Sequence, residues 1–338
     1  MTKVAIVGAG FMGGMHAQVY HILPEVKLTA IIDIDQDRAD KLARKFEAKS
    51  YSSLKEALKK EDIDAVDICL PTFLHPQYVI EAVRAEKNVF CEKPIALTLE
   101  AADRMIEEVE KKGVKFMVGH VLRFWPEYIK IKEIQESGKL GKLMWVTCTR
   151  LSPAPTWAWQ GWLTDVKRSG GALVDLHIHD IDFLLYLLGR PSSVYCQSAG
   201  KSSSYNHVFT TLSFPEGEIG FAEGGWDMPA EFPFTMSCSC LFEKGALEFN
   251  NRYEKTLILY SEGKEPEYPP VETQAELKAD VEGNIAELGG YFSEIKYFID
   301  CLEKNRNPEI AGAKIAREAL EVVLLAKKSL ETHNVVEV

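Results

Sequence analysis

Paired cysteines, a surplus of basic residues and long apolar runs are all missing from this sequence. The seven cysteines are odd in number, scattered, and include no CxxC pair, so neither a disulfide framework nor a zinc ribbon is indicated. The formal net charge of −11 argues against a nucleic-acid partner, because such proteins neutralise phosphates with clustered Lys and Arg. The longest apolar run, residues 183–188, is far shorter than the roughly 18 residues that span a bilayer.

The beginning of the chain also lacks the basic leader, apolar segment and cleavage site of a signal peptide. Together with the scattered cysteines, this predicts a cytoplasmic protein with reduced thiols and no membrane partner. With 338 residues, 46% of them hydrophobic and 26% charged, the chain is long enough for two domains of roughly 100 to 200 residues each.

The densest chemistry lies just after Gly170 and Gly171, where residues 175–182 hold three aspartates and two histidines. The residues alone leave three interpretations open: a metal site, an acid–base pair, or charges on the first turn of the apolar helix that follows. On a helix, Asp175 and His179 lie one turn apart on one face. The glycines before this stretch and the helix after it favour that arrangement over a strand.

The N-terminal residues predict a dinucleotide-binding unit. Residues 4–7 form an apolar run typical of a buried parallel strand, and a G-x-G-x-x-G motif and a helical stretch follow directly. The three glycines allow a tight turn, close approach of a pyrophosphate to the backbone, and close packing of helix on strand. The predicted contacts of this loop with the cofactor come from Gly8, Gly10, Phe11, Met12 and Gly13.

A second strand, residues 28–32, ends at Asp33. A carboxylate at this position binds the ribose hydroxyls of NAD and repels the 2′-phosphate of NADP. The sequence therefore predicts NAD as the cofactor and makes NADP the less favoured alternative, with Arg38 close enough in sequence to keep that alternative open.

Strands and helices continue to alternate as far as residue 119, with Ser53 and Thr98 as predicted helix caps. Six strands with helical crossovers predict a doubly wound Rossmann sheet, whose ligand binds at the carboxyl ends of the strands. Two of those ends are polar, either as solvated loops or as functional sites. The predicted cofactor contacts there are Leu70, Pro71, Thr72, His75, Glu92 and Lys93.

Lys93 follows the fifth strand of this pattern. A lysine at such an exit can hold a substrate oxygen or relay a proton. A cis bond between Lys93 and Pro94 is our hypothesis for how this lysine is aimed.

The alternating pattern ends near Arg123, which predicts a domain boundary between residues 121 and 122. Residues 1–121 then form the NAD(P)-binding domain, and residues 122–338 a domain for substrate binding and oligomerisation. From residue 194 to residue 260, short runs with β character are joined by turn sequences, which predicts a largely antiparallel sheet. Residues 261–283 are predicted to be a surface loop, and two amphipathic helices close the chain.

Three of the six tryptophans lie in residues 156–162, a segment without helix or strand periodicity. Indole faces stack on the apolar faces of sugars, so Trp157 and Trp162, together with Arg123, are predicted to contact a sugar-like substrate. Packing of a long loop is the alternative for these side chains.

These motifs, in this order, resemble the glucose-fructose oxidoreductase, inositol dehydrogenase and MocA (Gfo/Idh/MocA) superfamily. The resemblance covers essentially the whole chain and is carried by G-x-G-x-x-G, Asp33, Glu92-Lys93-Pro94 and the GG-x3-D-x3-H-D pattern of residues 170–180. It implies an α/β Rossmann domain followed by an α+β domain with a large, mostly antiparallel, open-faced sheet backed by helices. The open face would form a homodimer or homotetramer.

The resemblance also implies the chemistry, which is hydride transfer between a nicotinamide and a carbinol carbon of a sugar, an inositol-like polyol or a sugar derivative. His179 would act as general base, Lys93 would hydrogen-bond the same oxygen, and Asp175 would bind a neighbouring hydroxyl. The family is metal-independent, so no metal is expected, and His177 fits a packing or pocket role. Because Lys93 lies in the first predicted domain, the expected active site combines residues of both.

Two other functions remain open at this point. The same scaffold is used by NAD-dependent glycoside hydrolases and lyases, in which transient oxidation leaves no net redox change. A non-catalytic protein that senses a nicotinamide is the third alternative, although such a sensor has no need of Lys93, Asp175 and His179 together.

Overall fold

The structure is a computed structural model that describes residues 1–201, 203, 205–271 and 288–338. Within these ranges the chain forms two compact units. The first comprises Met1–Phe124 and Gln274–Arg317, and the second comprises Trp125–Thr273 and Glu318–Val338. Most of the predicted loop at residues 261–283 lies outside the described residues.

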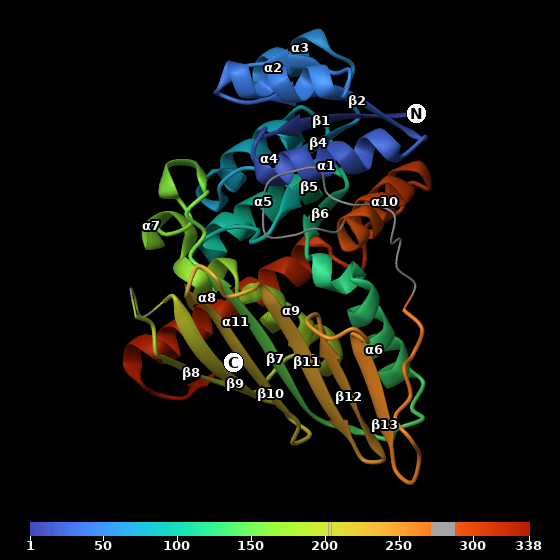
Figure 1. The fold of residues 1–338 in the computed structure, drawn as a ribbon. Coiled ribbons are helices and arrows are strands. Elements are labelled where there is room, and N and C mark those ends of the chain that lie inside the picture. The colour runs from blue at the N-terminus through green and yellow to red at the C-terminus, as the bar shows by residue number, and fades with distance from the viewer. Residues whose placement is uncertain (202, 204, 272–287) are drawn as a thin grey trace. The chain divides into compact units, whose positions relative to one another are not determined.

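The first unit contains a six-stranded sheet in which every pair of neighbouring strands is parallel, in the order β3-β2-β1-β4-β5-β6 (Figure 1). This order is that of the doubly wound Rossmann fold, as predicted. The strands are β1 (Thr2–Val7), β2 (Val26–Ile32), β3 (Lys49–Tyr51), β4 (Ala65–Ile68), β5 (Asn88–Glu92) and β6 (Phe116–Gly119). The helices are α1 (Phe11–Ile22), α2 (Gln36–Lys45), α3 (Leu54–Lys60), η1 (Thr72–Leu74), α4 (His75–Arg84), α5 (Leu99–Lys112), η2 (Val121–Phe124) and α10 (Gly289–Glu303).

The predicted caps set the starts of two of these helices. The side chain of Ser53 accepts a hydrogen bond from the backbone of Glu56 at 3.3 Å, and Thr98 accepts one from Ala101 at 3.2 Å. Each cap satisfies a backbone N–H that has no partner within the helix.

Helix α10 packs with the first unit although it comes from late in the chain. Its Tyr291 ring lies 6.2 Å from the ring of His16 on α1, and its Phe298 ring lies 5.6 Å from that of Phe90 on β5. Tyr291 and Phe298 therefore pack helix α10 against a helix and a strand of the Rossmann domain.

The second unit contains an eight-stranded sheet in the order β13-β12-β11-β7-β10-β9-β8-β14. Its neighbouring strands are antiparallel except for β7 and β10, which confirms the predicted mostly antiparallel sheet. The strands are β7 (Leu143–Pro153), β8 (Ser193–Ser198), β9 (His207–Ser213), β10 (Ile219–Met228), β11 (Thr235–Phe242), β12 (Gly245–Asn250), β13 (Leu257–Ser261) and β14 (Val336–Glu337). The helices are α6 (Pro126–Glu136), η3 (Trp159–Gly161), α7 (Val166–Ser169), α8 (Gly171–Asp175) and α9 (Ile178–Leu188), and α11 (Ala313–Thr332) runs on into this unit from the first.

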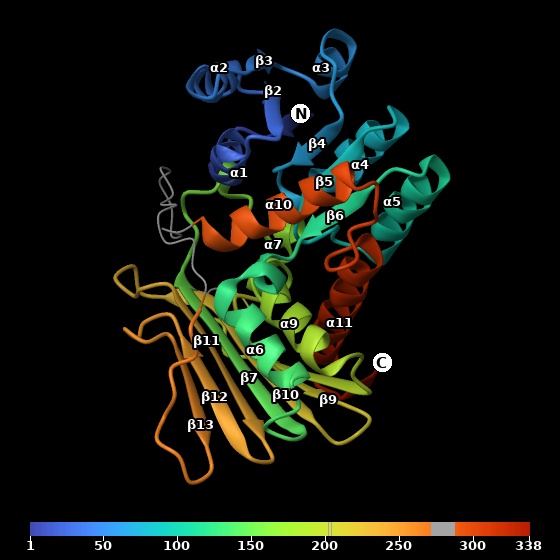
Figure 2. The same cartoon turned by 90° about the vertical axis from the view of Figure 1, so that its right-hand side faces the viewer.

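Helices cover one face of this second sheet. Val146, Cys148 and Arg150 of β7 are buried, whereas the alternate residues Thr147 and Thr149 are half exposed. Helices α8 and α9 contact strands β7, β9 and β10 from the buried side, and in Figures 1 and 2 the strands present their other face outward. Among the described residues, no helix covers that outer face.

A buried ion pair ties the covering helices to the sheet. The Arg150 guanidinium donates two hydrogen bonds to the carboxylate of Asp180, from Nε to Oδ2 at 2.9 Å and from Nη2 to Oδ1 at 3.0 Å. Asp180 lies on the first turn of α9, as one interpretation of the Asp/His stretch proposed, but it is buried against Arg150 instead of facing solvent. None of the helices in the described ranges has the length and apolarity that crossing a bilayer requires.

Candidate active site

The glycine-rich loop joins β1 to α1 and gives each glycine a different role. Gly8 has a φ of +108°, and a Cβ there would lie 2.3 Å from the carbonyl oxygen of Cys69. A Cβ on Gly13 would lie 1.8 Å from the carbonyl oxygen of Gly8. At Gly10, by contrast, no described atom lies within 4 Å of the Cβ position. The fold itself requires Gly8 and Gly13, whereas the open space at Gly10 fits a pyrophosphate at the start of α1.

Asp33 follows β2 and holds the same loop. One of its carboxylate oxygens accepts a hydrogen bond from the backbone N–H of Ala9 at 2.8 Å, and the other accepts one from Asp35 at 2.9 Å. The side chain is half buried. Its position at the edge of the loop fits the ribose contact that the sequence predicts.

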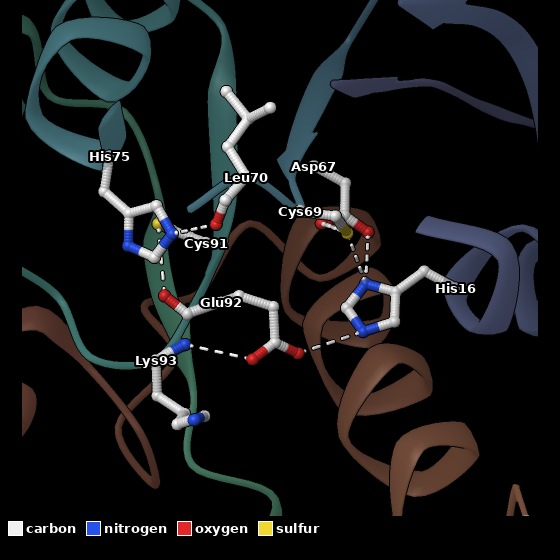
Figure 3. A network of polar contacts seen from close by, with 8 residues as sticks. All are labelled: His16, Asp67, Cys69, Leu70, His75, Cys91, Glu92 and Lys93. Atoms are coloured by element: carbon white, nitrogen blue, oxygen red, sulfur yellow. Dashed lines mark hydrogen bonds and ion pairs between the residues drawn. The ribbon is translucent and has the colours of Figure 1, made fainter. Parts of the chain in front are cut away.

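The exit of β5 places Glu92 and Lys93 at the carboxyl edge of the sheet (Figure 3). The Oε2 atom of Glu92 accepts a hydrogen bond from the backbone N–H of Lys93 at 3.1 Å. In Figure 3 the side chain of Lys93 points away from the imidazole rings of His16 and His75. The Lys93–Pro94 peptide bond is cis, as hypothesised.

The exit of β4 is shaped by a buried histidine. Leu70 and Pro71 are half exposed, and Thr72 and His75 are fully buried. The two ring nitrogens of His75 lie 2.8 Å from the carbonyl oxygens of Leu70 and Pro94, and burial lowers the pKa of this ring although both contacts oppose that effect. The imidazole therefore joins the exits of β4 and β5, which is a structural use that the sequence did not indicate.

A second buried histidine in this region was missed by sequence reasoning. His16 lies on α1, three residues after Gly13, and its Nδ1 atom is 2.8 Å from Oδ2 of Asp67 on β4. Its Nε2 atom forms an ion pair with Oε1 of Glu92 at 3.2 Å. The sequence carries no sign of these contacts beyond an aspartate within a buried strand.

The charges of this cluster follow from its geometry. Burial by itself lowers the pKa of His16, but the charge of Asp67 and the hydrogen bond to it raise that pKa well above its ordinary value. Burial raises the pKa of Glu92, yet the contact with His16 outweighs this and lowers it. Glu294 on α10 is buried nearby, and burial together with the charge of Glu92 raises its pKa well above the ordinary value. At neutral pH, His16 is therefore an imidazolium between two carboxylates.

Side chains with the spacing of a metal site occur within the described residues as two overlapping groups, both of which include His16. One group adds Asp67 and Cys69, and the other adds Glu92 and Glu294. In each group, His16 also contacts one of the carboxylates directly, that of Asp67 at 2.8 Å or that of Glu92 at 3.2 Å.

The Asp/His stretch belongs to the second unit. Asp175 is the last residue of α8 and is buried, and His179 is the second residue of α9 and is half buried. The backbone keeps right-handed helical dihedrals at Leu176 and His177. The N–H of His177, however, bonds back to the carbonyl of Ala172 at 2.8 Å, which ends α8. The stretch is helical and not extended, as predicted, but Asp175 and His179 do not share one helix, because the first lies on α8 and the second on α9.

His177 faces the sheet. Its ring is fully buried, and its Nε2 atom lies 2.9 Å from the hydroxyl of Thr210 on β9. Burial, with a smaller effect from the Arg150 guanidinium, lowers the pKa of His177 to about 3. The imidazole is neutral and packs between helix and sheet, as expected for a packing residue.

The other predicted substrate contacts are divided between the units. Arg123 of the first unit is buried, and its guanidinium donates a hydrogen bond to the carbonyl of Ile310 at 3.1 Å. In the second unit, Trp157 is 52% exposed. Trp162 is half buried against a small apolar cluster, namely Ala158, Leu163, Ala172, Leu176 and Trp226.

Comparisons with known proteins agree with these features. The family model described as "Oxidoreductase family, NAD-binding Rossmann fold" matches residues 2–120, and the model of the GFO/IDH/MocA C-terminal domain matches residues 128–248. Myo-inositol 2-dehydrogenase of Thermotoga maritima is 29% identical over 338 residues, which cover 97% of this chain and 96% of that protein.

Two further comparisons extend the picture. The 2,7-anhydro-N-acetylneuraminate hydratase of Escherichia coli is 29% identical over 67% of this chain and 62% of its own length. A solved structure of levoglucosan dehydrogenase with NADH and levoglucosan shares the fold, with a TM-score of 0.88 at 22% identity over 100% of this chain and 99% of that one. Because two domain models of one family match most of the chain in consecutive order, this protein belongs to the GFO/IDH/MocA oxidoreductases.

Proposed function

We propose that this protein is an NAD-dependent dehydrogenase that oxidises a secondary hydroxyl of a polyol or sugar, or reduces the corresponding carbonyl. One observation carries the proposal. In the first unit, an open glycine-rich loop, Asp33 and the end of β5 with Lys93 lie at one edge of a Rossmann sheet. Similarity to a myo-inositol 2-dehydrogenase over nearly the whole chain supports a polyol as the substrate.

The residues proposed to act are Lys93, Asp175 and His179. A bound nicotinamide supplies the electron chemistry by accepting or giving a hydride. Lys93 donates a hydrogen bond to the reacting oxygen and stabilises its developing negative charge. His179 takes the hydroxyl proton during oxidation and returns it during reduction, a role suited to histidine because its side chain exchanges protons near neutral pH. Asp175 binds a neighbouring hydroxyl, and Arg123, Trp157 and Trp162 are proposed as further substrate contacts.

The proposed cofactor is NAD in preference to NADP. The carboxylate of Asp33 repels a 2′-phosphate, and the next residue, Ile34, is an exposed apolar side chain that offers no positive charge. Arg38, the cation closest in sequence, forms an ion pair with Asp35 at 3.2 Å. Phe11, Met12, Leu70, Pro71, Thr72, His75 and Glu92 complete the proposed cofactor contacts.

We also propose that the outer face of the second sheet joins copies of the chain into a homodimer or homotetramer. Strand register places Ile219, Trp145, Leu241, Ala246 and Tyr260 in one row across five strands. Of these side chains, Trp145, Ile219, Leu241 and Tyr260 are 36% to 50% exposed. A contiguous apolar row of this kind is typical of a protein interface. All seven cysteine thiols are free, which supports a reducing compartment such as the cytoplasm.

A second function is favoured by the similarity to a 2,7-anhydro-N-acetylneuraminate hydratase. In that case tightly held NAD would oxidise the substrate only transiently, and no NADH would accumulate. Mixing the enzyme with excess NAD and substrate distinguishes the two functions, because a dehydrogenase forms NADH in proportion to product, whereas a transient oxidation returns the cofactor unchanged.

The direct experiment measures NADH formation with myo-inositol, scyllo-inositol and D-glucose, using NAD and NADP in parallel. Lys93→Met and His179→Asn are expected to lower kcat by about 10²- to 10⁴-fold while the Kd for NADH changes little. Lys27→Met and His21→Asn, which change exposed residues, serve as matched controls. An unchanged kcat in either active-site variant would contradict the proposed roles.

A further inference from the structure

Lys93 is held by two buried histidines that come from different helices. On the N-terminal side of Lys93, Oε2 of Glu92 accepts a hydrogen bond from the backbone N–H of Lys93. The other oxygen, Oε1, contacts Nε2 of His16 (Figure 3). On its C-terminal side, the carbonyl of Pro94 lies 2.8 Å from Nδ1 of His75. The backbone of residues 92–94 is therefore fixed at both ends by an imidazole that has no access to solvent.

The other nitrogen of each ring faces β4 or the exit of β4. Nδ1 of His16 is bonded to Asp67 on β4, and Nε2 of His75 lies 2.8 Å from the carbonyl of Leu70, just after β4. Both rings therefore connect the exit of β5 to the neighbouring strand. His16 adds a third element, because it lies on α1, the helix that begins at the glycine-rich loop.

The charge of the His16 cluster suits a fixed link. A cation buried without partners is strongly destabilising, whereas one placed between two carboxylates is stabilised by both. With Asp67 at 2.8 Å and Glu92 at 3.2 Å, the imidazolium of His16 occupies the position between the two carboxylates that a bound cation would otherwise take. Glu294, the remaining carboxyl of the cluster, is neutral when protonated and adds no further charge.

We propose that His16 and His75 are positioning residues for Lys93, and that they set the position of its backbone from opposite sides. This inference rests on the proposed function, in which Lys93 touches the reacting oxygen. A displacement of about 1 Å in such a group can lower the rate about 100-fold. Neither ring is proposed to touch the substrate.

The two nitrogens of each ring can be tested separately. Glutamine places a donor near the Nε2 position of histidine, and asparagine places one near the Nδ1 position. His16→Gln keeps the contact toward Glu92, whereas His16→Asn keeps only the contact toward Asp67. For the other ring the order reverses, because His75→Asn keeps the contact toward Pro94 and His75→Gln keeps only the one toward Leu70.

The proposal predicts a crossed pattern in kcat. His16→Asn and His75→Gln should lower kcat by about 100-fold, while His16→Gln and His75→Asn should lower it less than about 10-fold. In the two His16 variants, the KM for the polyol and the Kd for NADH should stay within about twofold. Met15→Ala, at an equally buried position of α1, removes no polar contact of the cluster, controls for general destabilisation and should leave kcat near that of the wild type.

A second readout needs no turnover. The amide of Lys93, which donates to Glu92, should exchange its hydrogen faster in His16→Asn than in His16→Gln, measured by NMR on uniformly labelled protein. If no polyol or sugar is oxidised by the wild type, the proposed function fails, and the exchange order still tests the link. The inference is overturned if kcat follows overall stability regardless of which contact is kept. It is equally overturned if the Lys93 amide exchanges at the same rate in His16→Asn as in His16→Gln. It is also overturned if the purified enzyme holds a stoichiometric divalent metal that His16→Asn loses.

Discussion

The buried imidazole of His177 should make the second unit sensitive to acid. Its pKa of about 3 in the folded protein lies far below the ordinary value of about 6.5 expected in the unfolded chain. Between these values the unfolded chain binds a proton that the folded protein does not, so stability is complete above pH 6.5 and falls as the pH decreases. From pH 8 to pH 5 this one residue should cost about 2 kcal/mol.

The surroundings explain why the charged form is excluded. The Thr210 hydroxyl contacts one ring nitrogen, and the Arg150 guanidinium disfavours a second positive charge nearby. Backbone occupies the other side, since a Cβ on Gly224 would lie 2.6 Å from Nδ1 of His177. Among the described residues, burial and the Arg150 guanidinium shift the pKa of this ring, whereas the charge of Asp67 raises the pKa of His16.

The assay is urea unfolding of the wild type and of His177→Gln at pH 8 and pH 5. Glutamine keeps a partner for Thr210 but does not titrate. All six tryptophans lie in the second unit, so their fluorescence reports the unfolding of the unit that contains His177. Relative to the variant, the wild type should lose about 2 kcal/mol more between the two pH values, whereas His21→Gln, at an exposed position of α1, should behave like the wild type. A difference below about 0.5 kcal/mol would mean that the folded protein accepts the charged ring, and the reasoning would be wrong.

The remaining predictions concern packing and charge. Gly10→Ala should fold like the wild type but bind NADH more weakly, because its Cβ meets only open space in the protein, whereas Gly13→Ala should destabilise the first unit in thermal unfolding. Arg150→Met should cost about 3 to 5 kcal/mol by leaving Asp180 as an uncompensated buried charge, and replacing both residues with apolar ones should recover most of that loss. Because the pKa of Glu294 is raised, its ionised form is disfavoured in the folded state, so Glu294→Gln should gain stability relative to the wild type as the pH rises above about 5. Equal pH dependence of the two proteins would contradict this last assignment.

Local sequence signals were enough to predict much of the fold. The glycine motif after residues 4–7, the strand that ends at Asp33 and the caps at Ser53 and Thr98 each depend on residues that are close in the chain. Short-range geometry fixes such features, so the order of strands and helices in the first unit follows from them. The turns of the second half similarly indicated an antiparallel sheet.

Contacts between distant residues were not predictable in the same way. His16 is one polar residue on a mostly apolar helix until β4 and β5 bring Asp67 and Glu92 to its two nitrogens. The pairing of Arg150 with Asp180 depends on how α9 crosses β7. An apolar stripe shows that a helix has a buried face, but it does not show which sheet that face will meet.

Helix α10 also bears on how the protein is made. The first unit is interrupted in the sequence, because Met1–Phe124 is completed only by Gln274–Arg317, which follow strand β13 of the second sheet. Tyr291 and Phe298, which pack on α1 and β5, leave the ribosome on the order of ten seconds after the strands they cover. Until then, the Rossmann sheet of the nascent chain lacks the helix that covers one of its apolar surfaces. The burial of His16, on which the proposed Lys93 link depends, is completed only when nearly the whole chain has been synthesised.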